Sequence, residues 1–541
     1  MNNIKSQQGA ALLILVLSII FSGAIFLLTQ NNSTSKHVSA ENKTSAALAK
    51  AKEALISYAV SHYLTSKNAP IFDNHLGYHG FLPCPESSIS PAEGEAPNLN
   101  CGGVRYANHL GRLPWKTLEI PPLKDNAGEC LWYAMSSAFS FNPPESQMLN
   151  DDTPGMFQVF NENRSIYKGA TPEDRAVAVV IAPGGPLNNQ ARVSATTGSP
   201  CNVLLNEAVA ADYLENYQGI DNALVSNTTA DRIDKFIHST ALNDNPSFND
   251  RIITITAKEI FDAIKARAPM YTDKITELGE TIGNCLIDYA TPASGCTDDC
   301  DADRQLCKDS ATTGQEVAAC SQQRNLCRTA CGGSNLPGNS GNNPGSSPGG
   351  TSYAQLPWPA PVDLKADYRN DNSYADLTNN SQGYFGRLPY KLPNSSDDIG
   401  VSVDNIFTIC NLKTSYPEMF RLWQHWKDHW FYVLGSDFAP DLSTSPASPC
   451  DTDCPEFNGT RYAAILIFSE ERINNQLRRT NETEDPYPDI ANSKATLGNY
   501  LEGNNESNYP DDNFNDAYGV DSINDRHFCI TADMLTVTEC P

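Results

Sequence analysis

Residues 175–192 read R-A-V-A-V-V-I-A-P-G-G-P-L-N-N-Q-A-R, and residues 461–478 read R-Y-A-A-I-L-I-F-S-E-E-R-I-N-N-Q-L-R. The two segments align without a gap. Each begins with a short run of apolar and β-branched residues, which is typical of a buried strand. Each ends in the same polar motif, N-N-Q-x-R. The chain therefore contains an internal repeat, and a buried strand is part of the repeated unit.

Five further blocks recur in the same order, at offsets between 274 and 299 residues. The matched ranges are 82–85 with 356–359, 111–116 with 386–391, 132–139 with 431–438, 212–215 with 499–502, and 249–257 with 524–532. Six ordered matches predict two β-rich copies, residues 80–265 and residues 354–541. Within a copy, short β-rich runs alternate with loops rich in Gly, Pro, Asn and Asp, which favours a mainly antiparallel sheet. Only the first copy follows a long helix, so we expect the second copy to cover its sheet by other means.

A palindromic cysteine pattern lies between the two copies. The order of spacings in Cys296, Cys300 and Cys307 is reversed in Cys320, Cys327 and Cys331. At about 100° per residue, each trio falls on one face of a helix. We therefore predict a disulfide-stapled helical hairpin over residues 285–332, with the bonds Cys296–Cys331, Cys300–Cys327 and Cys307–Cys320. The competing interpretation is zinc, but these spacings are poor matches to the usual C-x2-C knuckles.

A Gly/Ser/Asn/Pro tract, residues 333–353, follows the hairpin and is typical of a flexible linker. Ten cysteines remain outside the hairpin. Local pairs such as Cys84–Cys101 and Cys450–Cys454 fit the spacing, but sequence does not fix the connectivity. Sixteen cysteines in one chain indicate an oxidising compartment.

The first 67 residues are expected to form a leader, residues 1–9, and one long helix, residues 10–67. From Ala10 to Thr29 the chain has twenty residues without a charge, enough for a helix of about 30 Å that could span a bilayer. Lys5 lies on the N-terminal flank, which favours a cytoplasmic N-terminus. These features predict a single-pass inner-membrane protein with a periplasmic domain. The net charge of −26 argues against nucleic acid as a partner.

The order of polar leader, Gly9 and apolar helix resembles the type IV pilin and type II secretion pseudopilin family. The resemblance implies cleavage after Gly9 by a prepilin peptidase and methylation of the new terminus, Ala10. It also implies that one surface of the helix contacts other subunits of a filament, and the residues expected there are Ala10, Leu13, Ile14, Leu17 and Phe21. The alternative is a plain signal anchor that holds a monomeric domain.

One position departs from this family. The family usually has a glutamate at the fifth mature position, where this chain has Ile14. That glutamate neutralises the terminal amine of a neighbouring subunit, and its absence resembles the minor subunits thought to sit at a filament tip. Residues 47–59, 82–85, 111–118 and 131–134 also resemble large pilin-like proteins of Gram-negative bacteria, over about the first 200 residues.

Candidate sites for chemistry are few. His425 and His429 are spaced for one helix face and could hold a metal, but they lie among tryptophans, and an aromatic packing cluster is favoured. The repeated motifs Asn188-Asn189-Gln190-x-Arg192 and Asn474-Asn475-Gln476-x-Arg478 look like sites, yet polar side chains that tie loops to the backbone produce the same pattern.

Three further motifs are weaker. Asp511, Asn513 and Asn515 imitate the start of a calcium loop, but Asp516 and Ser522 stand where that loop needs glycine and glutamate. The segment Pro183-Gly184-Gly185-Pro186 is a turn and lacks the Gly-Lys-Ser/Thr of a phosphate loop. Neither G-x-S-x-G nor H-E-x-x-H occurs. We expect no catalysis, no cofactor and no metal.

The resulting prediction for the fold is α+β: a long N-terminal membrane-spanning helix, two repeated, mainly antiparallel pilin-like heads, and the disulfide hairpin between them. The predicted function is that of a minor pilin-like or pseudopilin-like subunit of a type IV pilus or type II secretion-type filament, at the tip, in assembly priming or in adhesion. Its expected partners are other pilin or pseudopilin subunits, the prepilin peptidase, the inner membrane and a surface ligand. The alternative is an inner-membrane-anchored periplasmic binding or structural protein that never enters a filament.

Overall fold

In the computed structural model, the structure describes residues 41–61, 79–97, 101, 107–140, 148–187, 190–192, 198–201, 209–225, 233–239, 247–267, 270–290, 354–365, 368–375, 384–391, 405–410, 412, 417–440, 450, 454–473, 476–478, 493–502, 513–514 and 524–541. The chain divides into two units. Unit 1 consists of Met1–Tyr58, Leu82–Asn142 and Pro154–Thr256, and unit 2 of Ala59–Phe81, Pro143–Thr153 and Ala257–Pro541. Each unit is therefore assembled from three separate stretches of chain.

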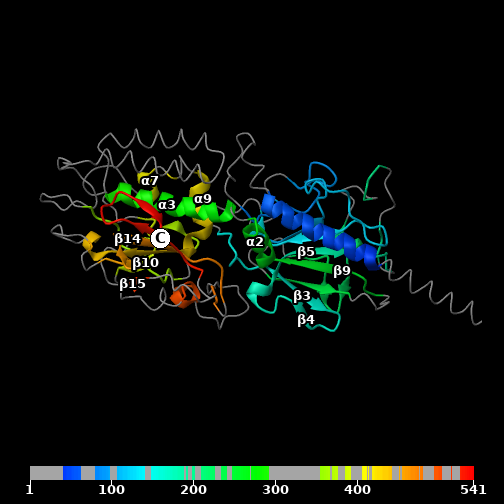
Figure 1. Ribbon diagram of the computed structural model, residues 1–541. Helices are drawn as coiled ribbons and strands as arrows, with labels where there is room; N and C mark the ends of the chain where they lie inside the picture. Colours follow the sequence, from blue (N-terminus) through cyan, green and yellow to red (C-terminus); the bar gives the residue numbers. More distant parts are fainter. Residues whose placement is uncertain are drawn as a thin grey trace, which may run out of the picture. The chain divides into compact units, whose positions relative to one another are not determined.

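Unit 1 is built on a seven-stranded sheet in the order β1-β2-β5-β3-β4, in which β9 also pairs with β5 and β8 with β3 (Figure 1). Its strands are β1 (His109–Arg112), β2 (Trp132–Met135), β3 (Phe157–Asn161), β4 (Ile166–Lys168), β5 (Ala176–Ala182), β8 (Asp234–His238) and β9 (Arg251–Thr256). All pairings are antiparallel except β3 with β8. The run A-V-A-V-V-I-A forms β5, which is buried along its whole length because strands pair with both of its edges.

A helix covers one face of this sheet. Residues 41–61 are helical, and Figure 1 shows this helix lying across β5 and β9. Its buried side is made of small and apolar residues at helical spacing, including Leu48, Ala51 and Leu55. Lys52 donates from Nζ to the carbonyl of Thr254 in β9, at 2.9 Å. On the sheet, the apolar cluster that includes Trp132 and Phe157 is packed with side chains from residues 210–225.

Unit 2 contains a five-stranded antiparallel sheet in the order β10-β11-β14-β16-β17. Its strands are β10 (Phe385–Arg387), β11 (Trp430–Leu434), β14 (Ala464–Phe468), β16 (Arg526–Ile530) and β17 (Val537–Glu539). A second, three-stranded sheet has the order β13-β12-β15, made of β13 (Thr460–Arg461), β12 (Glu456–Phe457) and β15 (Asn513–Phe514). The helices are α2 (Ala257–Lys265), α3 (Met270–Ala290), α7 (Ile406–Ile409) and α9 (Pro417–Trp426).

Short elements complete the two units. Unit 1 has the two-stranded ribbon β6 (Asn216–Tyr217) and β7 (Ile220–Asp221), and the 3-10 turns η1 (Ser137–Phe139), η2 (Pro172–Asp174) and η3 (Ala210–Asp212). Unit 2 has the 3-10 turns η4 (Asp371–Ser373), η5 (Lys427–His429), η6 (Ser436–Phe438), η7 (Ser493–Ala495) and η8 (Leu497–Asn499).

The two main sheets share one strand plan. In unit 1 the order β1-β2-β5-β9 is antiparallel throughout, and in unit 2 the order β10-β11-β14-β16 matches it strand for strand. Four of the six repeated sequence blocks lie on or overlap these matched strands. Within the described residues the copies also differ, because β3, β4 and β8 extend the sheet of unit 1 and β17 extends that of unit 2.

The second sheet, like the first, is covered by a long helix, which corrects the expectation that it would be covered in another way. Helix α3 contacts β14, β16 and β17 (Figure 1). A close contact is made possible by Gly283, since a Cβ added there would lie 2.4 Å from Cγ2 of Val537. The sequence carries a short trace of this correspondence. Residues 55–59 read L-I-S-Y-A, and residues 286–290 read L-I-D-Y-A.

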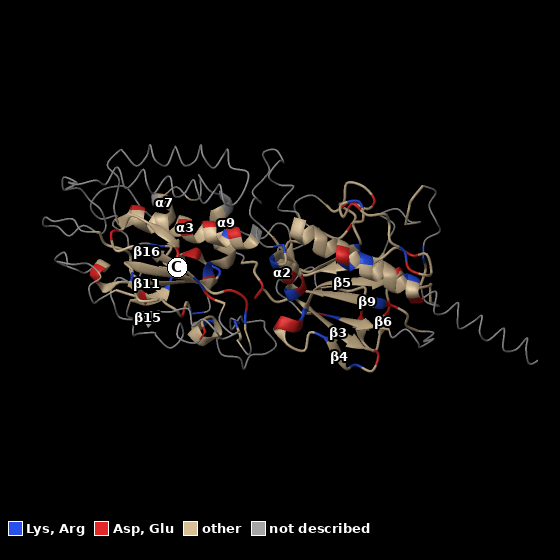
Figure 2. Ribbon diagram, viewed as in Figure 1, with Lys and Arg blue, Asp and Glu red and all other residues tan. Residues whose placement is uncertain are grey.

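The expectation of a membrane-spanning helix is corrected by the structure. The structure is α+β with β-sheets, but among the described residues no helix combines the length and apolarity needed to cross a membrane. The first described helix, residues 41–61, carries Lys50, Lys52 and Glu53 and packs on a sheet (Figure 2). The predicted single-pass inner-membrane location rested on a membrane-spanning helix, so it is corrected as well. Residues 1–40 lie outside the described residues.

Disulfide bonding, in contrast, is confirmed. All cysteines of the described residues are paired, as Cys84–Cys101, Cys130–Cys201, Cys285–Cys410, Cys450–Cys454 and Cys529–Cys540. Both local pairs named from the spacing are among them. The six cysteines of the predicted hairpin, and the linker of residues 333–353, lie outside the described residues.

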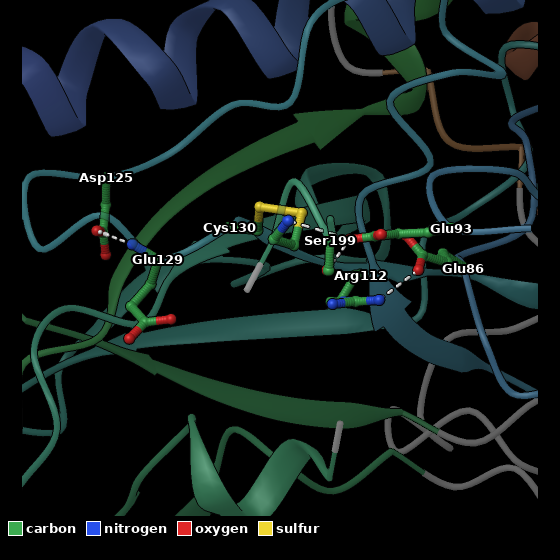
Figure 3. The surroundings of a disulfide bond; sticks show 8 residues. Glu86, Glu93, Arg112, Asp125, Glu129, Cys130 and Ser199 are labelled. Carbon is green, nitrogen blue, oxygen red and sulfur yellow. Dashed lines mark hydrogen bonds and ion pairs between the residues drawn. A yellow bond between two sulfur atoms is a disulfide. The ribbon is translucent and has the colours of Figure 1, made fainter. Parts of the chain in front are cut away.

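The Cys130–Cys201 bond fixes the loop that carries Cys201 to the start of β2 (Figure 3). Glu93 receives two hydrogen bonds from this loop, from Ser199 Oγ at 2.7 Å and from the backbone N–H of Cys201 at 3.0 Å. Nearby, Arg112 donates to Glu86 at 2.6 Å in an almost fully buried ion pair. Covalent, hydrogen-bonded and ionic contacts thus hold the loops of unit 1 around the edge of its sheet.

Candidate functional site

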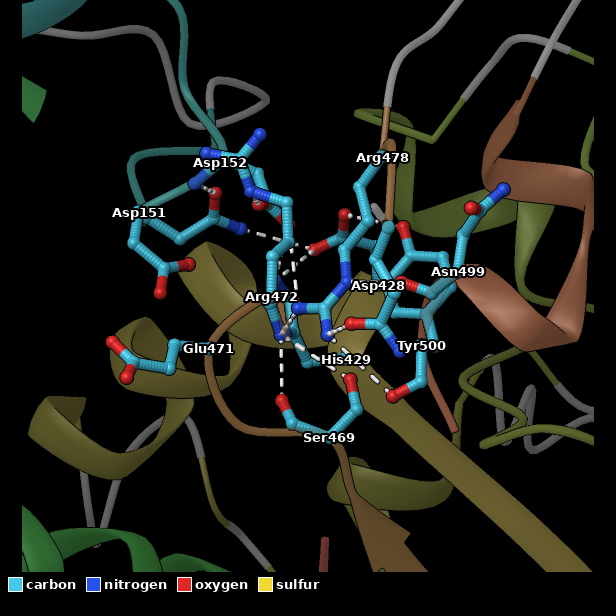
Figure 4. A network of polar contacts seen from close by, with 12 residues as sticks. Asp151, Asp152, Asp428, His429, Ser469, Glu471, Arg472, Arg478, Asn499 and Tyr500 are labelled. Atoms are coloured by element: carbon cyan, nitrogen blue, oxygen red, sulfur yellow. Dashed lines mark hydrogen bonds and ion pairs between the residues drawn. The ribbon is translucent and has the colours of Figure 1, made fainter. Parts of the chain in front are cut away.

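Unit 2 contains the densest group of buried charges among the described residues (Figure 4). Its centre is His429, at the end of η5 and just before β11. The surrounding side chains come from residues 148–153, from η5 itself, from the chain after β14, from η7 and from the end of η8. They are Asp152, Asp428, Arg472, Arg478, Lys494 and Tyr500. Burying so many charges is costly unless each is paired, so the pairing decides what the cluster can do.

His429 is contacted on both ring nitrogens. Its Nδ1 lies 2.7 Å from the carbonyl oxygen of Ser469, and its Nε2 lies 3.1 Å from Oδ2 of Asp152. Its Nδ1 also lies 3.2 Å from Nη1 of Arg478, so the ring lies between the Asp152 carboxylate and an arginine. These contacts hold the ring between residues 148–153 and the chain after β14. The side chains of His429 and Asp152 are 0% and 1% exposed, so water does not compete for these contacts.

Asp152 is held by cations as well as by the histidine. Arg472 Nε lies 2.9 Å from Oδ1, and Arg478 Nη1 lies 3.6 Å from Oδ2. Burial by itself raises the pKa of Asp152, but Arg478, His429 and Arg472 together outweigh it, so the pKa is lowered. Asp152 is therefore a carboxylate at neutral pH, and it ties residues 148–153 to the second sheet's framework.

Asp428 is the second buried carboxylate of the cluster. It is paired with Lys494, and it accepts hydrogen bonds from Tyr500 OH at 3.2 Å and from Asn150 Nδ2 at 3.1 Å. Burial raises the pKa of Asp428, but Lys494 and His429 outweigh the burial and lower it to about 2. Asn150 comes from the same segment as Asp152, so this segment contributes to both halves of the cluster.

Two buried arginines frame the cluster and bind mainly backbone. Arg478 donates to the carbonyls of Asn499 at 2.6 Å and Glu470 at 2.7 Å, and its guanidinium lies 4.6 Å from the centre of the Tyr500 ring. Arg387 donates to the carbonyl oxygens of Val362, Lys494 and Asp428 and lies within 5 Å of three aromatic rings. Each arginine thus joins several loops at once.

A Ser–His–Asp arrangement is present in outline but cannot act as a hydrolytic triad. Ser469 Oγ lies 3.4 Å from His429 Nδ1, and Asp152 lies on the other ring nitrogen. However, Nδ1 is already engaged at 2.7 Å by the carbonyl of Ser469 itself. Ser469 is also fully buried, so a substrate carbonyl has no path to its hydroxyl.

A metal interpretation is also unfavourable. Ligand atoms of Asp151, Asp152 and His429 lie within 4.8 Å of one another, which is close enough to share an ion. The carboxylates are already neutralised, because Lys265 lies 2.8 Å from Asp151 and the two arginines contact Asp152. A divalent cation would be repelled by these groups. The cluster is therefore an ion-paired scaffold.

The predicted histidine pair does not converge. His425 ends α9 and accepts a hydrogen bond at Nδ1 from the backbone N–H of Leu149, at 2.8 Å. Burial, with Lys427 and Arg421, lowers its pKa well below the ordinary value, so this ring is neutral. His429 faces Asp152 and Ser469 instead. The two histidines have structural roles on the same segment, as the packing interpretation expected.

The repeated Gln-x-Arg motif forms the same scaffold in both units. Gln190 Nε2 donates to Glu215 at 2.7 Å, and Gln476 Nε2 donates to Glu502 at 2.7 Å. Arg192 donates to the carbonyls of Gly184 and Asp212 and lies over the Tyr213 ring, as Arg478 does over Tyr500. The motif ties loops to backbone, which is the structural alternative considered from the sequence. The Asn residues at 188, 189, 474 and 475 lie outside the described residues.

Other predicted site residues cannot be placed. Gly9, Ala10, Leu13, Ile14, Leu17 and Phe21 lie outside the described residues, as do Asp511, Asn515, Asp516 and Ser522 of the calcium-like motif. Asn513 belongs to β15. Asp152, the residue that completes the cluster, was missed. It is far from His429 in sequence and carries no motif, so only the fold brings the two together.

Comparison with known proteins adds no relative. None of the protein-family models matches this chain, and neither the curated proteins nor the solved structures contain a significant match.

Proposed function

We propose that this protein is a minor pilin-like subunit of a type IV pilus or type II secretion-type filament. The observation that carries the proposal is the sequence around the N-terminus, in which a polar leader ends at Gly9 and an uncharged apolar segment begins at Ala10. The fold lends support, because the resemblance implies a head in which an antiparallel sheet packs on a long helix. Both units have that layout.

A tip or priming position is the version of this role that we favour. Ile14 replaces the glutamate that neighbouring subunits of the family use, so this chain is poorly suited to be followed by further copies of itself. The second copy, which the linker of residues 333–353 separates from the cysteine segment, would then act as an adhesive module. Prepilin peptidase and other pilin-like subunits are the proposed partners.

A second candidate function is an exported binding or structural protein that never enters a filament. The same residue, Ile14, favours it, because the absent glutamate also removes a contact used in assembly. The buried ion-paired clusters and disulfides are equally suited to this role, since they hold loops in fixed positions.

The two functions differ in their processing at Gly9. We would measure the mass of the mature N-terminal peptide in cells with and without prepilin peptidase, and in a Gly9→Leu variant. The filament proposal predicts a methylated Ala10 terminus that is lost both without the peptidase and in the variant. An uncut Met1, or cleavage after Ala24, where the small residues Ser22-Gly23-Ala24 resemble a signal-peptidase site, would leave the second candidate. Ser6→Ala, which lies in the leader but not at the cleavage position, is the matched control.

A further inference from the structure

Two carboxyl groups lie side by side in the core of unit 1. The backbone N–H of Glu215 donates to Oδ2 of Asp250 at 2.9 Å, and the backbone N–H of Asp250 donates to Oε2 of Glu215 at 3.1 Å. This reciprocal arrangement brings the two carboxyl groups side by side, and Oδ1 of Asp250 receives no hydrogen bond from the described residues. Two ionised carboxylates held this close and away from water repel each other, so the pair favours one bound proton.

The same arrangement recurs in unit 2. The backbone N–H of Glu502 donates to Oδ2 of Asp525, and the backbone N–H of Asn524 donates to Oε2 of Glu502, both at 3.4 Å. The carboxyl groups of Glu502 and Asp525 are therefore also neighbours. In both units the aspartate directly precedes a strand of the main sheet, β9 or β16, and the glutamate follows a 3-10 turn.

Among the described residues, the surroundings of the first pair do not supply a cation that would let both groups ionise. Asp250 is fully buried and Glu215 is nearly so. The charged and titratable groups on the neighbouring elements are Asp125 and Glu129, Arg192, Asp212 and Asp221, His238 and Arg251. Arg192 reaches Glu215 only through Gln190, and its charge is met by Glu129 at 3.1 Å. Arg251 is paired with Glu41.

These contacts determine which group holds the proton. Burial, followed by the charge of Glu215, raises the pKa of Asp250 well above its ordinary value, while burial raises the pKa of Glu215 as well. Asn222 donates from Nδ2 to Oδ2 of Asp250 at 2.9 Å, which leaves Oδ1 as the oxygen that can carry the proton. His238 is neutral near neutral pH because burial lowers its pKa.

We propose that the Glu215–Asp250 pair binds a single proton between its two side chains, and that this proton is a pH-sensitive lock joining the turn before Glu215 to the start of β9. The lock is protonated and closed in acidic and neutral surroundings. When the proton is lost, two adjacent buried carboxylates repel each other and the turn is released. This device is independent of whether the chain enters a filament.

The sign of the pH dependence follows from proton linkage. The folded state keeps the proton of Asp250 at pH values where the unfolded chain, with an aspartate pKa of about 3.9, has released it. Local stability is therefore complete below that pH and falls as the pH rises through the folded pKa. While the pH lies between the two pKa values, the loss amounts to about tenfold in the opening equilibrium per pH unit.

The test uses the full-length, disulfide-bonded protein and two readouts. Infrared difference spectra at pH 7 detect a protonated carboxyl group directly. Hydrogen exchange of peptides covering residues 209–225 and 247–256, corrected for intrinsic exchange, measures the opening of the lock between pH 6 and pH 9. We expect an acid C=O band at pH 7 and faster local opening at pH 9. Asp250→Asn should remove this pair's contribution to the band and the pH dependence of these peptides, because the carboxamide donates to Glu215 without a titratable proton.

Variants at other carboxyl groups show whether the effect is specific to the Glu215–Asp250 pair. Asp525→Asn should act only on peptides around residues 497–502 and 524–530, and Asp273→Asn, at an exposed carboxyl in the first turn of α3, should change nothing. If Asp250→Asn fails to fold, Glu215→Gln supplies the same hydrogen bond from the other side. The proposal is overturned if no acid band is present at pH 7, or if added calcium rather than a proton restores protection at pH 9.

Discussion

The two copies use the same arginine but neutralise it differently. Arg192 is paired with Glu129 in unit 1, whereas Arg478 lies next to Asp152 in unit 2. Asp428 stands at the sequence position equivalent to Glu129, but it is paired with Lys494. Both copies therefore keep the arginine and its backbone carbonyl partners. The carboxylate beside the arginine is Glu129 in unit 1, and in unit 2 it is Asp152 from residues 148–153.

Removal of the Asp152 carboxylate should be strongly destabilising. Asp152→Ala would leave the buried guanidinium of Arg478 without the carboxylate beside it, and breaking a buried pair in this way costs about 3–5 kcal/mol. Chemical denaturation followed by tryptophan fluorescence would measure the loss, because Trp426 and Trp430 flank the cluster.

The matched control is Glu539→Ala. Glu539 pairs with Arg526, but its side chain is 45% exposed, so we expect a loss of about 1 kcal/mol or less. Equal effects of the two substitutions would mean that the buried cluster contributes no more than a surface ion pair.

At the scale of residues, the sequence indicated part of the site and not the rest. The Gln-x-Arg motif was recognisable because it recurs, and its structural role followed from ordinary loop chemistry. Asp152 was not recognisable, because a single aspartate between two repeated blocks has no periodicity or spacing that points to a partner. Asp152 acquires its role only when folding buries its carboxylate beside His429, Arg472 and Arg478.

At the scale of elements, α3 completes the repeat. The strands were predictable from short β-rich runs bounded by turn residues. The covering helix of the second copy was missed because only five residues, L-I-D-Y-A, match the first helix, and the cysteine segment separates them from the remaining blocks. With α3 included, each copy is a helix packed on an antiparallel sheet.

The contact of α3 with its sheet depends on glycine. Replacing glycine by alanine within a helix ordinarily stabilises it by about 1 kcal/mol. Gly283→Ala should instead lower the melting temperature, because the new methyl group would meet the branched, buried side chain of Val537. Thr272→Ala, at an exposed position of the same helix, is the control and should be neutral or stabilising. A stabilised Gly283→Ala protein would contradict this packing.

The Cys285–Cys410 bond should contribute more than the short Cys450–Cys454 bond. It joins α3 to the end of α7 across 125 residues, whereas the other bond spans four. In the loop-entropy model, replacement of Cys285 and Cys410 by serine should cost about 2–5 kcal/mol. The equivalent double serine variant at 450 and 454 should cost clearly less. Thermal unfolding of both variants under oxidising conditions gives the comparison.

At the scale of the whole molecule, the order of residues along the chain does not follow the two units. Unit 2 includes residues 59–81 and 143–153 as well as everything after Thr256. Sequence blocks alone suggested a simple tandem arrangement, because the repeat gives no information about segments that lie between its blocks.

This organisation predicts that a C-terminal fragment will not fold normally. A chain of residues 257–541 lacks Asn150 and Asp152, so His429, Arg478 and Asp428 lose partners that are buried in the intact unit. We expect this fragment to be largely insoluble or to exchange its amide hydrogens rapidly in β11 and β14. Addition of a chain segment carrying residues 143–153 should improve protection. Native-like protection of the fragment alone would contradict the assignment.

The central claim is that the chain is a subunit of a pilin-like filament. The most direct test is quantitative mass spectrometry of filaments sheared from cells and purified, compared with cells that produce the Gly9→Leu variant. Our account predicts a few copies per filament of the protein beginning at methylated Ala10, and none in filaments from the variant strain. Purified filaments that contain no trace of the protein, although the mature chain is abundant in the cells, would contradict it.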